Sequence, residues 1–393
     1  MAAPIQPFDP RQDFRLPNWS LVRRDRQSEN WLAAVYRRFS RFRQMPAGLS
    51  ARSLGPAGGE NSSYVGLMPR DATGDVSSRR IPSSHLTPTI FHETWWLEIA
   101  GQDNYREAVV SSDSALIGRL PYFYKTKLRW HTQLIMPMLT HVLGPALAPE
   151  IVRKTSARSM KPFSVTSDLI AQLPKASHVE FMLHRGITDT LAFRAAGFST
   201  GVNFTVEIAP ASPEVLWRQM RDKTRNVIRR AQERLTVVDL PDPQQFIDFY
   251  QENLRHRGLR NYYEEQICGQ LIAECLRRGV GRLLAAVDPS GALQASIFTI
   301  WDHEVEYYYL SSRRLDSMNG ATSLLIWSAI QHASMNGLMF DMDGVNSANL
   351  LLVTGFGGTI SPRYVVWRTT PAFRAAKYVA GLLNNASVSL RDP

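Results

Sequence analysis

The stretch that decides the fold is residues 282–312, RLLAAVDPSGALQASIFTIWDHEVEYYYLSS. It contains three runs rich in apolar, aromatic and β-branched residues, separated by the turn sequences DPSG at 288–291 and DH at 302–303. Runs of this kind with such short connections are typical of antiparallel strands. We therefore predict three consecutive antiparallel strands, at 282–287, 293–301 and 304–311.

The residues after this stretch predict a helix followed by a parallel strand. Small and polar residues at 319–323 begin a helix that we expect to extend to 336, and a short apolar run follows at 339–343. Because a helical crossover returns the chain to the same end of a sheet, this strand should lie parallel to the last of the three. A helix at 347–354, a strand at 363–368 and a helix at 372–384 are expected after it.

The residues before 282 have the same mixed α/β character. Ser212 can cap a helix and Pro213 suits its first turn, so we expect one helix from here to Leu235. Gly258 and Gly279 are expected to end two further helices in the left-handed conformation. The other expected elements are helices at 91–100, 168–173, 190–196, 244–257 and 264–278, and strands at 107–117, 118–124, 178–183, 203–208 and 236–240.

Length and composition indicate a globular protein with more than one lobe. The chain has 393 residues, which is too many for one ordinary compact core, and its hydrophobic fraction of 44% and charged fraction of 20% are globular values. We predict lobes at 85–209 and 210–386, with an extension at 1–84 and a tail at 387–393. The longest apolar run, 134–149, is interrupted by prolines and a histidine, so no spanning helix is expected.

Two sequence features favour a cytoplasmic location. The first thirty residues carry charges and prolines without a continuous apolar core, so a conventional secretory signal is not expected. Cys268 and Cys275 are the two cysteines and lie in one expected helix, so a bridge between them is not expected and a reducing compartment is indicated.

The positive charge is concentrated in the extension. Of the net charge of +10, more than half lies in residues 1–84, which hold thirteen arginines, no lysine and seven acids. Within it, 31–43 has apolar residues at helical spacing opposite four arginines, which predicts an amphipathic helix. Such a helix can dock on the body or a partner, or make peripheral contact with an anionic membrane. No zinc-finger, RRM or KH motif accompanies the charge, so nucleic-acid binding is not expected.

Short motifs in both halves of the chain narrow the fold further. They are KTRNVIRRA (223–231), YLSSR (309–313), FDMDGV (340–345), GFGG (355–358) and PRY (362–364) in the second lobe, and FHETWWL (91–97), LPY (120–122) and MPMLT (136–140) in the first. With the strand and helix order, these motifs resemble the Fem-type or CelD-like branch of the GNAT acyltransferases, over about residues 86–379. The resemblance implies an α/β fold of two tandem GNAT-like lobes with mixed twisted sheets, and one donor site in the second lobe.

The resemblance also implies a class of reaction. Members of this branch include enzymes that add amino acids to peptidoglycan precursors from aminoacyl-tRNA, and acyl-CoA-dependent enzymes associated with polysaccharide biosynthesis. Residues 351–356 contain no lysine of the aminoacyl-transferase pattern, which favours acyl-CoA as co-substrate. The expected function is transfer of an acyl group from acyl-CoA to an amine of a sugar or cell-envelope precursor. The alternatives are an aminoacyl-tRNA-dependent transferase and a non-catalytic tandem-GNAT binding module.

The candidate donor site lies around the second-lobe helix at 320–336. In a GNAT fold the strand before this helix, here 307–311, separates from its parallel neighbour and offers free backbone donors. The cofactor pyrophosphate needs backbone N–H groups at a helix amino terminus, and the small-residue turn at 319–322 fits, although a simple helix start would look the same. Ala321 stands where the usual pattern has a second glycine. The candidate donor-binding residues are Leu310, Ser311, Arg313, Arg314, Asn319, Gly320, Ala321 and Thr322.

Two acids are the candidate general bases. Asp341 and Asp343 are two residues apart, which places both on the same face of a strand, and paired acids can raise one another's pKa. They can equally cap the following helix or fix the turn at Gly344. Tyr309 or its neighbour Tyr308 can protonate a leaving thiolate, although tyrosines also simply suit strands.

Three arginines are candidates for binding the acceptor. Arg221, Arg225 and Arg229 recur at helical spacing, so they can hold a phosphorylated acceptor or form a solvated face. Trp95 is a candidate for the wall of the acceptor groove. No spacing of histidines, cysteines and acids suggests a bound metal.

Overall fold

The computed structural model describes residues 86–127, 131–152, 160–259, 261, 263–346 and 349–377. The basic extension, its predicted helix at 31–43 and the tail at 387–393 lie outside these residues, so the peripheral membrane contact stays a prediction. Within the described part of the chain, no helix combines the length and the apolar character that a membrane span requires.

The chain up to residue 208 consists mostly of strands with short helices. The predicted turn of its first hairpin at 117–118 is wrong, because the chain turns at Asp113 and Ser114, which have φ of +51° and +65°. The short polar residues there tolerate this conformation, while Ile117 continues the strand. The elements are η1 (Ile90–His92), α2 (Thr94–Gly101), η2 (Gln102–Asn104), β1 (Tyr105–Ser112), β2 (Ala115–Lys127), β3 (His131–Ile135), β4 (Ala146–Leu147), α3 (Pro149–Val152), α4 (Lys161–Ala171), β5 (His178–Met182), α5 (Leu191–Ala195) and β6 (Ser199–Ile208).

Apart from its first predicted helix, the rest of the chain follows the predicted order of helices and strands. Gly258 and Gly279 end α8 and α9 with φ of +63° and +66°, as predicted. Residues 371–377 are helical. The elements are α6 (Pro213–Gln219), α7 (Asp222–Gln232), β7 (Thr236–Asp239), α8 (Pro243–His256), α9 (Glu265–Arg277), β8 (Gly281–Val287), β9 (Leu293–Trp301), β10 (Val305–Arg313), α10 (Ala321–Met335), β11 (Met339–Gly344), α11 (Leu350–Val353), η3 (Thr354–Phe356) and β12 (Thr359–Thr369).

The single helix predicted from Ser212 to Leu235 is wrong, because the chain breaks between α6 and α7. Met220 and Arg221 are extended there, with ψ of 152° and 146°. Met220 is only 3% exposed, so the break turns its side chain into the core. The Arg225 guanidinium lies 3.4 Å from the carbonyl oxygen of Trp217, at the end of the interrupted helix, where the Met220 backbone N–H also donates to that oxygen.

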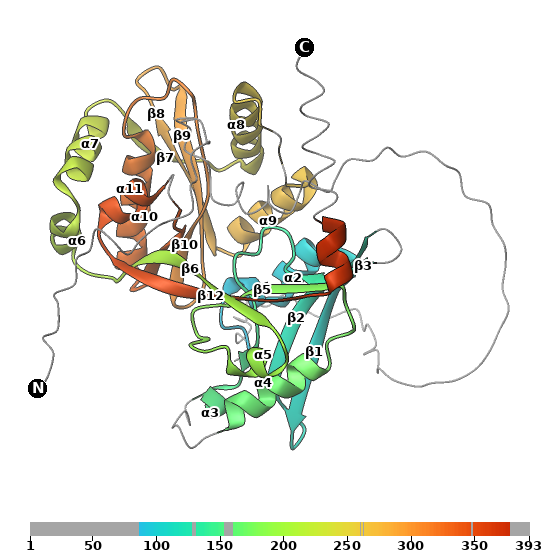
Figure 1. Cartoon of the computed structure of the whole chain (residues 1–393). Coiled ribbons are helices and arrows are strands. Elements are labelled where there is room, and N and C mark those ends of the chain that lie inside the picture. Colours follow the sequence, from blue (N-terminus) through green and yellow to red (C-terminus); the bar gives the residue numbers. More distant parts are fainter. Residues whose placement is uncertain are drawn as a thin grey trace, which may run out of the picture.

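The strands form one large mixed sheet, which confirms the predicted α/β fold class (Figure 1). Its order is β1-β2-β3-β5-β12-β6-β11-β10-β9-β8-β7, and β10 and β11 run parallel as predicted. Strand β12 lies between β5 and β6 and is antiparallel to both. Strands from before and after residue 210 therefore alternate at the middle of the sheet, and the lobe boundaries stay a prediction.

Helices cover both faces of the sheet in the second half of the chain. On one face α6, α7 and α10 pack around buried Trp327, Ile228 and Leu325, and on the other α8 and α9 pack together with α2. The second of these clusters contains Phe91 and Trp96 from the first lobe beside Tyr309 of β10. The two halves of the protein therefore share one core next to β10.

Candidate active site

Strands β10 and β11 pair over a short distance and then separate. Their parallel register covers only Val305–Tyr307 opposite Met339–Asp341. Beyond it β10 continues along β9 to Arg313 with an irregularity between Tyr308 and Leu310, while β11 pairs with β6. The separation falls in the segment where the sequence predicted it, so Leu310 and Ser311 lie on the part of β10 that has left β11.

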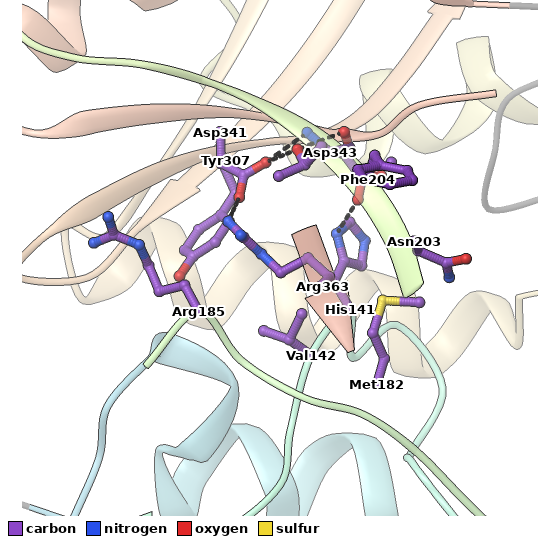
Figure 2. Close-up of a pocket in the computed structure, with 12 residues that line it drawn as sticks. His141, Val142, Met182, Arg185, Asn203, Phe204, Tyr307, Asp341, Asp343 and Arg363 are labelled. Carbon is purple, nitrogen blue, oxygen red and sulfur yellow. Dashed lines mark hydrogen bonds and ion pairs between the residues drawn. The ribbon is translucent and has the colours of Figure 1, made fainter. Parts of the chain in front are cut away.

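A pocket lies at the point of separation, where the end of β11 meets the first lobe (Figure 2). Asp341 and Asp343 both reach it, so the structure brings the two predicted acids together. Its lining residues come from three parts of the chain: His141, Val142, Met182 and Arg185 from the first lobe, Asn203, Phe204, Thr205 and Arg363 from β6 and β12, and Tyr307, Asp341, Asp343 and Gly344 from β10 and β11.

Asp341 is a buried carboxylate, and each of its oxygens has at least one partner. One oxygen accepts hydrogen bonds from the Thr205 hydroxyl and from the Asp343 backbone N–H, and the other lies 2.9 Å from an Arg363 nitrogen. Burial raises the pKa of Asp341, and Arg363 and Thr205 counteract part of that rise. Through these contacts Asp341 joins β11 to Thr205 of β6 and Arg363 of β12.

Asp343 and His141 form an acid–imidazole pair. Asp343 has a left-handed backbone with φ of +62°, and its carboxylate lies 3.3 Å from His141 Nδ1. The imidazole is 4% exposed and packs against Tyr309 and Phe91, with ring centroids 4.5 and 5.4 Å away. Its Nε2 is buried and has no hydrogen-bond partner among the described residues. With the Nδ1 proton on the Asp343 side, Nε2 is a hydrogen-bond acceptor without a partner among the described residues.

Two other histidines hold the segment that carries His141. His184 Nε2 lies 3.0 Å from the Pro145 carbonyl oxygen and His92 Nε2 lies 3.2 Å from the Gly144 carbonyl oxygen. Burial lowers the pKa of His184 to about 4 and the pKa of His92 well below its usual value, so both are neutral donors. The position of His141 is therefore fixed by buried contacts on the first-lobe side.

Two arginines that line the pocket, Arg185 and Arg363, belong to a chain of alternating charges. Arg363 lies 2.7 Å from Glu207, which also pairs with Arg185 at 3.1 Å, and Arg185 in turn pairs with Glu304. Burial alone would raise the pKa of Glu207, but the Ser361 hydroxyl and the Arg363 charge lower it. Arg185 is partly exposed at the rim, which makes it the cation of this network nearest to solvent.

The other predicted donor-site residues lie at the start of α10. Gly320 has φ of +93°, and a Cβ there would lie 2.8 Å from the Val227 carbonyl oxygen of α7. Ala321 is 1% exposed. Gly320 is therefore required for packing against α7, whatever the turn binds. Asn319 is exposed, Thr322 is half-buried, and Arg314 pairs with Asp316 at 2.9 Å.

The two neighbouring tyrosines of β10 point to opposite faces of the sheet. The Tyr309 hydroxyl donates to the Leu139 carbonyl oxygen on the first-lobe side. Tyr308 packs against the core that contains α10, and burial raises its pKa to about 12 despite a hydrogen bond with Ser311. Tyr308 thus lies on the α10 side, and Tyr309 on the His141 side.

The predicted acceptor-binding side chains are not among those that line the pocket. Arg221 caps α7 and donates to the Thr354 hydroxyl, Arg225 pairs with Asp222, and the Arg229 guanidinium lies 5.4 Å from the Trp217 ring. The break between α6 and α7 separates Arg221 from the continuous helical stripe that the sequence predicted. Trp95 lies against Arg278, with 4.8 Å between guanidinium and ring.

The sequence reasoning did not identify His141, Arg363, Arg185 or Thr205 as site residues. His141 carried one signal, because it is a titratable residue inside the otherwise apolar run at 134–149. The two arginines and Thr205 carried none, since their roles depend on the placement of β6 and β12 beside β11.

Comparison with known proteins identifies a domain within the second half of the chain. Residues 218–347 match the family model of the acetyltransferase (GNAT) domain. The chain contains a GNAT-type acetyltransferase domain. This GNAT domain supports an acyltransferase and implies acyl-CoA as co-substrate, and it confirms the resemblance predicted from the sequence. No group of three or more metal-ligating side chains occurs among the described residues.

Solved structures extend the similarity beyond the GNAT domain. The structure of FemX matches 75% of this chain and 96% of its own, with a TM-score of 0.57 and 11% identity, which shows a shared fold. Two other structures are weaker matches. L-PGS from Bacillus licheniformis matches 74% of this chain and 90% of its own, with a TM-score of 0.45 and 10% identity. A tandem GNAT protein from the clavulanic acid biosynthesis pathway matches 67% of this chain and 83% of its own, with a TM-score of 0.43 and 12% identity. No curated protein sequence matches the chain.

Proposed function

We propose that the protein transfers an acyl group from acyl-CoA to an amine of a sugar or cell-envelope precursor that occupies the pocket at the end of β11. The observation that carries the proposal is the His141–Asp343 pair, which places an unpartnered buried nitrogen where β10 and β11 separate. Two buried cysteines without a disulfide agree with a cytoplasmic setting, where acyl-CoA is available.

In the proposed reaction, His141 Nε2 accepts a proton from the acceptor ammonium or attacking amine, and Asp343 stabilises the resulting imidazolium. The amine nitrogen forms a bond to the thioester carbonyl carbon, and the carbon–sulfur bond breaks. The leaving thiolate takes up one proton from water, and the proton that His141 accepted returns to water, which regenerates the neutral imidazole. Asp341 and Arg363 act as positioning residues, because they shape the turn that presents Asp343.

Release of free thiol tests the proposal directly. The protein is incubated with acetyl-CoA and longer acyl-CoAs against a panel of amino sugars and nucleotide-linked amino sugars. Removal of the base in His141→Gln should lower kcat by about 10²- to 10⁴-fold. Asp343→Asn should lower kcat in the same direction. The matched control is His303→Gln, because His303 is 57% exposed and lies outside the pocket.

Three outcomes would count against the proposal. Unchanged kcat in His141→Gln would remove the proposed base. Turnover with aminoacyl-tRNA but not with any acyl-CoA would identify the alternative donor class. Failure to bind any thioester by a folded protein would favour a non-catalytic binding module.

A further inference from the structure

Strands β6 and β12, at the middle of the sheet, carry exposed apolar side chains on one face. Residues directly opposite each other in an antiparallel pair share a face, and Ile360 is opposite Val206 while Pro362 is opposite Phe204. Val206 is buried in the cluster that α6, α7 and α10 cover, whereas Phe204 and Ile360 are 48% and 56% exposed. Val202 and Pro362 on the same face are exposed as well.

The exposed residues lie between two groups of helices. Helices α6, α7 and α10 cover the face as far as Val206, and α4 and α5 cover the cluster that contains Val366 of β12. Val366 shares the face of Ile360, because an even number of residues separates them in one strand. Figure 1 shows β6 and β12 crossing between α10 and α11 on one side and α4 and α5 on the other. Exposed apolar side chains that gather in this way mark a contact surface.

Helix α11 extends the apolar surface. It packs on the same face through Val353, which is buried in the cluster under α10, while Leu350 is exposed and Leu351 is 76% exposed. Val345, which precedes α11, donates its backbone N–H to the Phe204 carbonyl oxygen at 2.7 Å. Phe204 also lines the pocket, so the surface borders the candidate active site. We call this set of residues the apolar patch: Val202, Phe204, Leu350, Leu351, Ile360 and Pro362.

The rim of the apolar patch beside α11 is basic. Residues 213–232, which form α6 and α7, contain six basic and two acidic residues. The junction of these helices lies against the end of α11, because the Arg221 guanidinium donates to the Thr354 hydroxyl. Arg218, Arg221 and Lys223 are exposed at this junction. Apolar side chains beside exposed cations match an anionic lipid surface, which accepts the former among its acyl chains and the latter among its headgroups.

Charge also distinguishes between possible occupants of the apolar patch. The predicted amphipathic segment at 31–43 has apolar residues that could cover it, but its four arginines would be repelled by the basic rim. A second copy of the chain, related by a two-fold axis, would bring the same basic rim to the interface. An anionic bilayer is instead attracted by this rim.

We propose that the apolar patch and its basic rim dock the protein on the surface of an anionic phospholipid bilayer. Leu350 and Leu351 would enter the boundary between headgroups and acyl chains, and Arg218 and Lys223 would contact lipid phosphates. This inference goes beyond the proposed acyl transfer and does not rest on it, because docking requires neither the donor nor the acceptor.

Co-sedimentation of the full chain with lipid vesicles tests the proposal. Vesicles of phosphatidylcholine alone are compared with vesicles in which about one third of the lipid is phosphatidylglycerol. Wild-type protein should bind the anionic vesicles about 10-fold more tightly or better, and added salt should reduce this preference because it screens the cations of the rim.

Two substitutions in the docking surface should weaken binding to the anionic vesicles. Leu351→Glu should weaken it by about 10-fold, because an apolar side chain no longer enters the bilayer and a negative charge meets anionic lipid. Lys223→Gln should weaken it by about 5-fold through the loss of one cation. Met335→Glu is the matched control and should bind like wild type, because it adds the same charge at a residue that is 77% exposed at the end of α10, outside the apolar patch.

Three outcomes would overturn the inference. The first is equal binding of wild type to both kinds of vesicle. The second is unchanged binding of Leu351→Glu, which would assign membrane contact to another part of the chain, such as the basic extension. The third is a wild-type dimer and a Leu351→Glu monomer in light scattering, which would show that a second copy covers the apolar patch. Absence of acyl transfer, by contrast, would overturn the proposed function and leave vesicle binding unaffected.

Discussion

Neutral His184 should make the stability of the protein depend on pH between pH 7 and pH 5. Its imidazole is 5% exposed, donates to Pro145 and accepts from the Gly186 N–H, so both ring nitrogens are used in the neutral form. Burial lowers its pKa to about 4, whereas an unfolded histidine titrates at about 6.5. The unfolded chain therefore binds a proton in this pH range while the native state does not.

The magnitude follows from the two pKa values. The stability that the neutral His184 contributes is fully present above the pKa of the unfolded state and is lost as the pH falls toward the pKa of the folded state. For His184 alone, the free energy of unfolding should fall by about 2 kcal/mol between pH 7 and pH 5, and by about 3 kcal/mol down to pH 4. His92 acts in the same direction, because its pKa is also lowered by burial.

Urea denaturation of wild type and His184→Gln at several pH values measures the effect. Glutamine keeps a side-chain N–H donor but cannot be protonated. The stability difference between wild type and the variant should therefore shrink by about 2 kcal/mol from pH 7 to pH 5. His303→Gln, at an exposed site, should show no such convergence. Parallel pH curves for wild type and His184→Gln would refute the assignment of a neutral buried imidazole.

Three further predictions concern packing and buried groups. His332 lies 2.7 Å from the fully buried Glu306, so its loss should leave a buried carboxylate without its partner. His332→Ala should therefore lower the free energy of unfolding, measured by urea denaturation, by about 3 kcal/mol. A decrease below about 1 kcal/mol would contradict this. Gly320→Ala should lower the free energy of unfolding by about 2 kcal/mol more than Gly337→Ala, because both glycines have positive φ but only Gly320 contacts α7. Equal decreases would show that α7 can move to accept the added methyl group. Both cysteines are buried, and burial raises the pKa of Cys268 to about 12. A thiol reagent should therefore modify neither cysteine in the native protein and both after unfolding. Labelling of the native protein would contradict the buried placement.

Local sequence signals predicted the second half of the fold well. Apolar alternation and the short turns at 288–291 and 302–303 determine three antiparallel strands, and these patterns do not depend on distant contacts. The break after α6 was missed because Met220 and Arg221 have ordinary helix propensity. Tertiary packing, which buries Met220, overrides that propensity.

The candidate site was predictable only in part. Asp341 and Asp343 could be placed together because two residues of one strand end suffice for the inference. The sequence could not distinguish the roles of the two acids, because the hydrogen bonds of Asp341 come from Thr205 and Arg363 on other strands. His141 is more than 190 residues from Asp343 and meets it only through the packing of the first lobe against β10.

The position of β12 has a consequence for synthesis on the ribosome. Strands β5 and β6 are made early, but the strand that lies between them, Thr359–Thr369, is among the last described segments of the chain. Until it emerges, the nascent chain carries two strand edges without their partner, which are exposed to wrong pairing. The amino-terminal half therefore cannot complete its part of the sheet during translation, and a stop codon ahead of residue 359 should yield an aggregation-prone product rather than an independent folding unit.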